Sequence, residues 1–143
     1  MSGDPGLNQV APRAGTQVLE QAFDRDSLYA LRAAVAAHAA EAGLPQQQVY
    51  DVVTAAHELA ANAVRHGAGH GRLRLWADGR SLRCQVSDDG PADRDATRPD
   101  PAAWPRKHSH GLWLVEQVAD QVSLKRDPGG TNATVTFIIG SPS

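Results

Sequence analysis

A long amphipathic helix predicted over residues 45–66 constrains the fold more than any other segment of the chain. Its apolar side chains recur at helical spacing along one arc, which is the pattern of a helix that packs against a core. That arc consists of Val52, Val53, Ala56, Leu59, Ala60, Ala63 and Val64. The opposite side carries four polar residues, Glu58, Asn62, Arg65 and His66. Because asparagine and histidine are mediocre helix formers, they add no local stability to an Ala-rich helix. This side is therefore either a solvated polar face or a functional site.

Shorter periodic runs and turn residues predict the other elements. In chain order we expect a strand at 18–23, helices at 24–42 and 45–66, strands at 72–76 and 82–86, a helix from about residue 110, and strands at 122–125 and 134–139. Asp24 or Asp26 is expected to cap the first helix. The helices cluster between groups of strands, and the hairpins require antiparallel pairing. We therefore expect an α/β (α+β) two-layer sandwich, with three helices on one face of a mixed, mostly antiparallel sheet.

The composition of the 143-residue chain limits its functions. The length suits one domain, which we place at 16–139, between a disordered arm at 1–15 and a short tail at 140–143. The net charge of −2 gives no electrostatic case for direct binding to nucleic acid or to an anionic membrane. The single cysteine, Cys84, excludes an internal disulfide, and the sequence has neither a signal peptide nor a membrane-length apolar run. We therefore expect a soluble, cytoplasmic protein.

Four short motifs occur in a fixed order along the chain. They are Glu58-x-x-x-Asn62, Asp88-x-Gly90, Ser109-His110-Gly111-Leu112 and Gly129-Gly130-Thr131. Each motif is weak alone, because most Asp-x-Gly patterns are turns and a glycine pair suits any hairpin. The segment between the second and third motifs lacks periodicity and is long for a loop inside a domain, as lids and binding loops are, although plain disorder has the same composition. The order and spacing of all four motifs together are specific.

This combination resembles the GHKL superfamily of ATP-binding proteins, and within it the branch of small anti-sigma-factor serine/threonine kinases. The resemblance covers about residues 18–139 and implies the Bergerat-type ATP-binding fold. The matching segments are HELAANAVRHG (57–67), VSDDGP (86–91), HGLWLVEQVAD (110–120) and GGTNATVTF (129–137). The implied cofactors are ATP or ADP and Mg²⁺.

The resemblance also implies roles for the matching residues. Asn62 would be the Mg²⁺ ligand, and Glu58 would be the general base that activates a hydroxyl group or a water. Asp88 would accept a hydrogen bond from the adenine amino group, and Gly90 would let the backbone approach the base. Gly111 would present the N–H groups of the first helical turn to the phosphates.

The remaining residues that match the family pattern are expected to lie beside the same nucleotide. His110 and Leu112 share the first helical turn with Gly111, and His110 could add a hydrogen-bond donor. Thr131 would contact Asp88 or a phosphate, and His66 would lie at the nucleotide. Ser109 stands where the family usually has a glycine, so the lid would close differently or bind phosphate less tightly. The cations available near the lid are Arg106 and Lys107.

Several functions are compatible with these observations. The first is a serine/threonine kinase that phosphorylates a STAS-type anti-anti-sigma partner and sequesters a sigma factor, in a branch whose members are commonly dimers. The second is a nucleotide-binding sequestration module with negligible phosphotransfer, and the third is an ATP-binding domain that acts with a separate sensor kinase. A metal site built from the pairs His66–His70 and His108–His110 is disfavoured, because glycines interrupt the first pair and the chain has a single cysteine.

Overall fold

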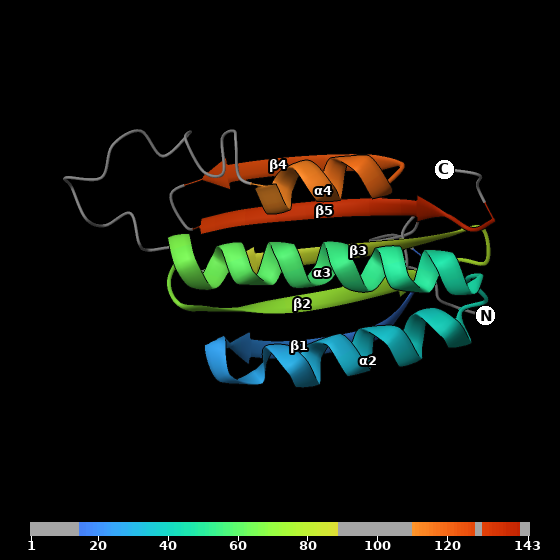
Figure 1. The fold of residues 1–143 in the computed structure, drawn as a ribbon, viewed down its shortest axis with the longest axis horizontal. Coiled ribbons are helices and arrows are strands. Elements are labelled where there is room, and N and C mark those ends of the chain that lie inside the picture. The colour runs from blue at the N-terminus through green and yellow to red at the C-terminus, as the bar shows by residue number, and fades with distance from the viewer. Residues whose placement is uncertain (1–14, 89–109, 128–129, 141–143) are drawn as a thin grey trace, which may run out of the picture.

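The chain forms two layers, with the α-helices packed on one face of a five-stranded sheet (Figure 1). The computed structural model describes residues 15–88, 110–127 and 130–140. In chain order the elements are β1 (Thr16–Asp24), the 3₁₀ turn η2 (Arg25–Ser27), α2 (Leu28–Glu41), α3 (Gln46–His66), β2 (His70–Ala77), β3 (Ser81–Asp88), α4 (His110–Val118), β4 (Gln121–Asp127) and β5 (Gly130–Ile138). The predicted element order and the α/β sandwich with helices on one face are confirmed. The predicted loop and four residues assigned to it or to its borders lie outside the described residues: Gly90, Arg106, Lys107 and Ser109.

The strand order of the sheet is β1-β2-β3-β5-β4. The sequence predicted a mixed sheet, but all four neighbouring pairs of strands are antiparallel. β4 and β5 form a hairpin with Asp127 opposite Gly130, which places β5 between β3 and β4. β3 and β4 therefore run in the same direction without being neighbours, and α4 lies in the connection between them.

The hydrophobic core lies between the sheet and the helices. On β2, the fully buried Leu73 and Leu75 face the helices and alternate with Arg72 and Arg74, as the period of a strand requires. Each such buried leucine contributes roughly 1.5–3 kcal/mol to folding. α3 lies in the middle of the helix layer and contacts α2, α4, β2, β3 and β5. Cys84 is buried in this core, and burial raises the pKa of its thiol to about 12, so it acts as a small apolar side chain.

Local hydrogen bonds explain where the first helix begins. The Asp24 Oδ1 atom accepts from the backbone N–H groups of Asp26 at 2.9 Å and Ser27 at 3.1 Å. The Ser27 hydroxyl in turn accepts from the Asp24 N–H at 2.9 Å, which completes a capping box. Asp24 therefore caps η2, and α2 begins at Leu28, later than the sequence suggested.

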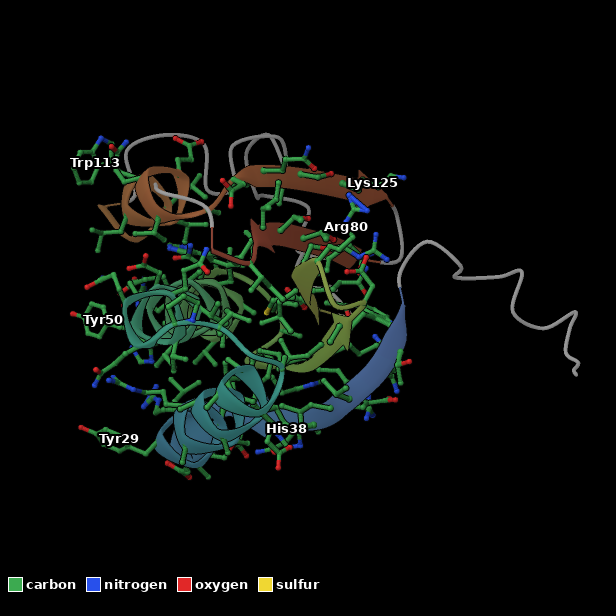
Figure 2. The ribbon with its side chains drawn as sticks, turned by 90° about the vertical axis from the view of Figure 1, so that its right-hand side faces the viewer. Tyr29, His38, Tyr50, Arg80, Trp113 and Lys125 are labelled. Atoms are coloured by element: carbon green, nitrogen blue, oxygen red, sulfur yellow. The ribbon has the colours of Figure 1, made fainter. Side chains whose placement is uncertain are left out.

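The outer surface of the helix layer carries one exposed aromatic side chain on each helix. They are Tyr29 on α2, Tyr50 on α3 and Trp113 on α4, all on the side away from the sheet (Figure 2). Among the described helices, none is long and apolar enough to cross a membrane.

Candidate active site

α3 carries the two central candidates, Glu58 and Asn62, one helical turn apart. The sequence placed Asn62 with Arg65 and His66 on a side away from the core, and this placement is wrong for Asn62. Its side chain is fully buried, Glu58 is half-buried, and only Arg65 and His66 are exposed. Because α2 and α4 both pack against α3, burial extends beyond the stripe of α3 that faces the sheet. Asn62 is thus a buried polar residue and not part of a solvated face.

The buried amide of Asn62 is only half paired. Its Oδ1 atom accepts a hydrogen bond from Nη2 of Arg65 at 3.0 Å. Its Nδ2 group is buried and has no hydrogen-bond partner within the described part of the chain. A buried polar group left unpaired costs about 1–3 kcal/mol, so such groups are rare and usually have a functional reason. The bonded Arg65 was not among the site residues predicted from the sequence, although its i, i+3 spacing from Asn62 was a usable signal.

Glu58 meets the first turn of α4. Gly111 is buried there, and a Cβ atom added to it would overlap the Glu58 carboxylate. Glycine at this position therefore lets the Glu58 side chain keep its place, and the close approach of α4 to α3 leaves the Glu58 carboxylate beside the N-terminal end of a nine-residue helix. His110 begins α4, and Leu112 packs partly buried against the core.

A second group of candidates gathers around Asp88, the last residue of β3. Asp88 is buried, and its Oδ1 atom accepts from the backbone N–H of Ala68 at 3.2 Å. A Cβ atom on Gly67 would overlap the Asp88 carboxylate, so only glycine fits at that position. Thr131, also buried, lies directly opposite Asp88 in the β3–β5 register. A buried carboxylate and a buried hydroxyl are thus cross-strand neighbours.

Both groups lie at one end of the molecule. The C-terminal ends of α3 and β3 meet the N-terminal ends of α4 and β5 there, on the left of Figure 1. The backbone N–H of Gly67, beside Asp88, donates to the carbonyl of Ala63 at 3.0 Å, and Ala63 follows Asn62 directly. The topology therefore brings together Glu58, Asn62, Asp88, Gly111 and Thr131.

His57, which sequence reasoning did not select, precedes Glu58 on α3. Its Nδ1 atom is buried without a hydrogen-bond partner in the described residues. Burial lowers the pKa of His57 below 6.5, the nearby Glu58 opposes this effect, and Arg32 and Arg65 add to it. The imidazole is therefore neutral at pH 7. In the described ranges no group of three or more histidine, cysteine, aspartate or glutamate residues could hold a metal ion.

The residues present fit a magnesium nucleotide. The unpaired Nδ2 group of Asn62 can donate a hydrogen bond to a phosphate oxygen, and its Oδ1 atom is the kind of carbonyl oxygen that Mg²⁺ takes as a ligand. The glycines at 67 and 111 keep side chains away from the Asp88 and Glu58 carboxylates. The first turn of α4 offers N–H groups of the kind that bind phosphates.

Comparison with known proteins gives a family match and two similar structures. A family model of the histidine kinase-like ATPase domain matches residues 22–137. The crystal structure of the RsbU and RsbW domains of a Mycobacterium tuberculosis protein superimposes with a TM-score of 0.63 at 22% identity over 88% of this chain. This chain covers 34% of that longer chain. The SiaB–SiaC complex from Pseudomonas aeruginosa matches with a TM-score of 0.55 at 16% identity, over 93% of this chain and 96% of that one. Among curated proteins none matches significantly.

Proposed function

The chain belongs to the histidine kinase-like ATPase family, and on that premise we propose that it binds Mg·ATP and transfers the γ-phosphate to a hydroxyl group of a partner protein. One observation carries the proposal: the fully buried, half-paired amide of Asn62 lies one turn from Glu58, beside the glycine that starts α4. A buried unpaired amide has a cost to folding, and a bound ligand would offset that cost.

The adenine base is proposed to bind at Asp88. The carboxylate is fixed by the Ala68 N–H and stands opposite Thr131, so an acceptor is held in place at the bottom of the site. An acceptor selects the exocyclic amino group of adenine, whereas guanine presents a carbonyl oxygen at the corresponding position. This arrangement favours ATP over GTP.

The phosphates are proposed to bind between α3 and the start of α4. Mg²⁺, when bound with the nucleotide, would neutralise charge on the phosphates. Asn62 is the residue that would hold it, through the Oδ1 atom that now accepts from Arg65. A metal ion on that oxygen would repel the positive guanidinium of Arg65, so we expect Arg65 to release the oxygen, which would leave its charge available for the phosphates.

Glu58 is proposed to act as the general base. Its carboxylate lies against Gly111, at the helix end proposed to hold the phosphates. A carboxylate in that position can accept the proton of an attacking hydroxyl group. In a family with both kinase and ATPase members, such a group is what transfer to a serine or threonine of a partner requires.

The proposed partners are a STAS-type anti-anti-sigma protein as substrate and a sigma factor as the sequestered protein, with the chain acting as a homodimer. The two similar structures support a protein partner, since one contains RsbU and RsbW domains and the other is a complex of SiaB with SiaC. The exposed aromatic residues Tyr29, Tyr50 and Trp113 also suit protein contacts, in which tyrosine and tryptophan are enriched.

A second function is sequestration without transfer. The Asn62–Arg65 hydrogen bond favours it, because it places a positive guanidinium at the oxygen that the metal ion would need. The two proposals differ in a single outcome, which is whether the γ-phosphate reaches a partner.

Nucleotide-dependent stabilisation followed by phosphotransfer tests the proposal. A ligand at about 100 times its Kd stabilises by roughly 2.7 kcal/mol, which corresponds to a Tm increase of about 5–10 °C for a domain of this size. We expect this increase with Mg·ATP and not with Mg·GTP. Radiolabelled γ-phosphate should then appear on a STAS protein and not on its serine-to-alanine variant. Stabilisation without transfer to any STAS partner would select sequestration, and equal stabilisation by GTP would contradict the Asp88 assignment.

A further inference from the structure

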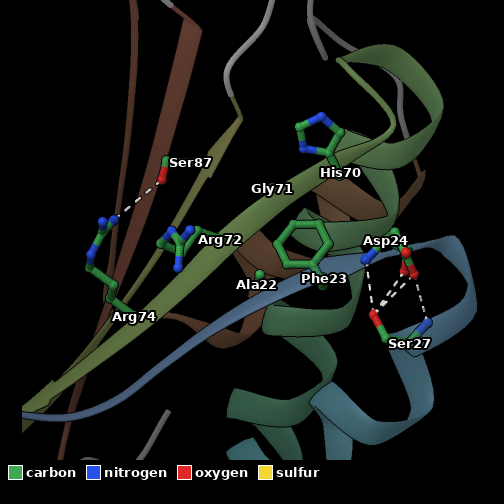
Figure 3. Close-up of a pocket in the computed structure, with 9 residues that line it drawn as sticks. All are labelled: Ala22, Phe23, Asp24, Ser27, His70, Gly71, Arg72, Arg74 and Ser87. Atoms are coloured by element: carbon green, nitrogen blue, oxygen red, sulfur yellow. Dashed lines mark hydrogen bonds between the residues drawn. The ribbon is translucent and has the colours of Figure 1, made fainter.

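A hollow of about 440 Å³ lies where the end of β1 meets the start of β2, and it extends over the sheet face that carries Arg72 and Arg74 (Figure 3). Ser87, which lines it, directly precedes Asp88, so the hollow adjoins the candidate active site but shares no residue with it. It is lined by Ala22, Phe23, Asp24, Ser27, His70, Gly71, Arg72, Arg74 and Ser87. The volume is in the range of pockets that hold small molecules. We propose that this hollow binds the phosphate group of a small phosphate ester, with Arg72 and Arg74 as its cationic ligands.

The strand register creates the hollow. Ala22 of β1 lies directly opposite Arg72 of β2, and Arg72 lies directly opposite Ser87 of β3. The long Arg72 side chain is therefore flanked on both neighbouring strands by a small residue. Glu20 and Arg74 form the next pair along β1 and β2, so the second guanidinium lies on the same face.

The two guanidinium groups share one weakly held carboxylate. Nη1 of Arg72 lies 3.4 Å from Oε2 of Glu20, and Nη2 of Arg74 lies 3.5 Å from the same atom. Nη1 of Arg74 donates to the Ser87 hydroxyl at 3.4 Å. Well-formed bonds between arginine and carboxylate are about 2.7–2.9 Å long and often bidentate. A single oxygen at these distances leaves most of the donors of both arginines available to a ligand.

A phosphate suits this donor set better than a second carboxylate. Two positive charges face Glu20, and the Asp24 carboxylate across the hollow is held by the backbone of η2, so a ligand must add charge and acceptors that Glu20 lacks. A phosphate monoester carries a charge of about −1.5 to −2 at pH 7 and offers three acceptor oxygens. One oxygen can meet each guanidinium, and the third can accept from the Ser87 hydroxyl.

The other side of the hollow sets the character of the ester. Figure 3 shows Asp24 and Ser27 across the hollow from Arg72 and Arg74. Oδ1 of Asp24 is held by the backbone N–H groups of η2, so this carboxylate is directed towards η2. A carboxylate, a hydroxyl and His70 are suited to the hydroxyl groups of a ligand rather than to a second anionic group. The proposed ligand is therefore a phosphorylated polyhydroxy compound.

Titrations followed by amide NMR shifts test the site, with inorganic phosphate, ribose 5-phosphate and unphosphorylated ribose as probes. We expect both phosphates to shift the amides of Ala22, Arg72 and Ser87, with ribose 5-phosphate binding more tightly and ribose without effect. Shifts confined to the C-terminal end of α3 would overturn the proposal, and they would report only on the candidate active site. Because Ser87 adjoins Asp88, the shifts at Ala22 and Arg72 are the ones that distinguish the two sites.

Four variants separate a built site from a general basic surface. Arg72→Gln and Arg74→Gln should each weaken ribose 5-phosphate binding at least tenfold. Glu20→Gln, which removes the competing carboxylate, should strengthen it. Ala22→Leu should abolish binding without changing any charge, because the new side chain would fill the hollow. These last two variants keep the proposal testable if an arginine variant fails to fold.

The matched control is Arg83→Gln. Arg83 lies on the same sheet face, over the Trp76 ring at 5.2 Å, and does not line the hollow. The Arg83→Gln variant should bind ribose 5-phosphate as tightly as the parent does. Equal losses in Arg83→Gln and Arg72→Gln, or citrate binding as tightly as ribose 5-phosphate, would overturn the proposal. Tighter binding of a phosphoserine peptide than of ribose 5-phosphate would overturn the assignment to a small ester.

Discussion

Gln48 and Asn62, two buried amide side chains near opposite ends of α3, are held in contrasting ways. Gln48 is paired on both atoms, because its Nε2 donates to the Ile138 carbonyl at 2.8 Å and its Oε1 accepts from the Gly140 N–H at 2.7 Å. Asn62 has one partner, the exposed side chain of Arg65, and an unpaired Nδ2. Gln48 joins α3 to the end of β5 through two hydrogen bonds, whereas Asn62, although fully buried, makes one hydrogen bond to an exposed side chain. The difference distinguishes a fully paired end of α3 from the end at which we propose that the nucleotide binds.

The largest effect is expected for Glu58→Gln, which keeps the shape of the side chain and removes the base. Phosphotransfer should fall by a factor of about 10²–10⁴ while Mg·ATP affinity changes little. Single-turnover transfer of labelled phosphate to a STAS partner, followed at several Mg·ATP concentrations, would measure both the phosphotransfer rate and the Mg·ATP affinity. Gln48→Ala, compared per folded molecule, should transfer at the parent rate. Parent-like transfer by Glu58→Gln would remove Glu58 from the mechanism.

Gly111→Ala should disturb the packing of α4 against Glu58 of α3 and so destabilise the fold. The added Cβ would overlap the Glu58 carboxylate, so either that side chain must turn away or α3 and α4 must separate, at a cost of up to about 1–3 kcal/mol. Alanine otherwise favours a helix over glycine by up to about 1 kcal/mol. In a Glu58→Ala background the loss should therefore shrink or reverse. Denaturant unfolding of the four proteins measures this coupling, and an equal loss in both backgrounds would mean that Glu58 is not the obstacle.

Gln48→Ala should destabilise the fold by about 1–3 kcal/mol, because it removes two hydrogen bonds and leaves the Ile138 carbonyl without its donor. Asn62→Ala should cost less, since it also removes an unpaired buried group. Urea midpoints at constant m-value give the comparison. A larger loss for Asn62→Ala than for Gln48→Ala would contradict the distinction between the two ends.

The smallest effect concerns pH. Burial lowers the pKa of His57 in the folded state below 6.5, its value in the unfolded chain, so the unfolded state binds more protons in the window between these two values. Stability should be constant above about pH 6.5 for this group and should fall as the pH decreases below it. His57→Gln should flatten that part of the stability profile. An unchanged slope between pH 7 and pH 5.5 in the variant would assign the pH dependence to other groups.

The spacing of apolar residues and the residue types at the turns predicted most of the fold. The alternation around Leu73 and Leu75 and the turn at Gly79 specify the β2–β3 hairpin, because both signals are local. The burial of Asn62 could not be predicted in the same way. A helical wheel describes one helix, whereas the side chain is enclosed because neighbouring helices flank α3.

The site was predicted unevenly for a similar reason. Asp88 and Thr131 could be placed together only through the resemblance, since their pairing depends on the β3–β5 register. The i, i+3 spacing of Asn62 and Arg65 allows their hydrogen bond without specifying it, and the contact of Gly111 with Glu58 joins two helices and is encoded by no motif. The hollow at β1 and β2 depends on the pairing of Ala22 with Arg72, which are 50 positions apart in the chain.

Calorimetric titration with Mg·ATP of the parent, Asn62→Ala and Gln48→Ala tests the central claim most directly. We expect Mg·ATP to bind the parent, to bind Asn62→Ala at least about tenfold more weakly, and to bind Gln48→Ala with the affinity of the parent. This result would place the nucleotide at the end of α3 that holds the half-paired amide. Parent-like affinity of Asn62→Ala would contradict the account, because the buried amide would then have no part in binding the nucleotide.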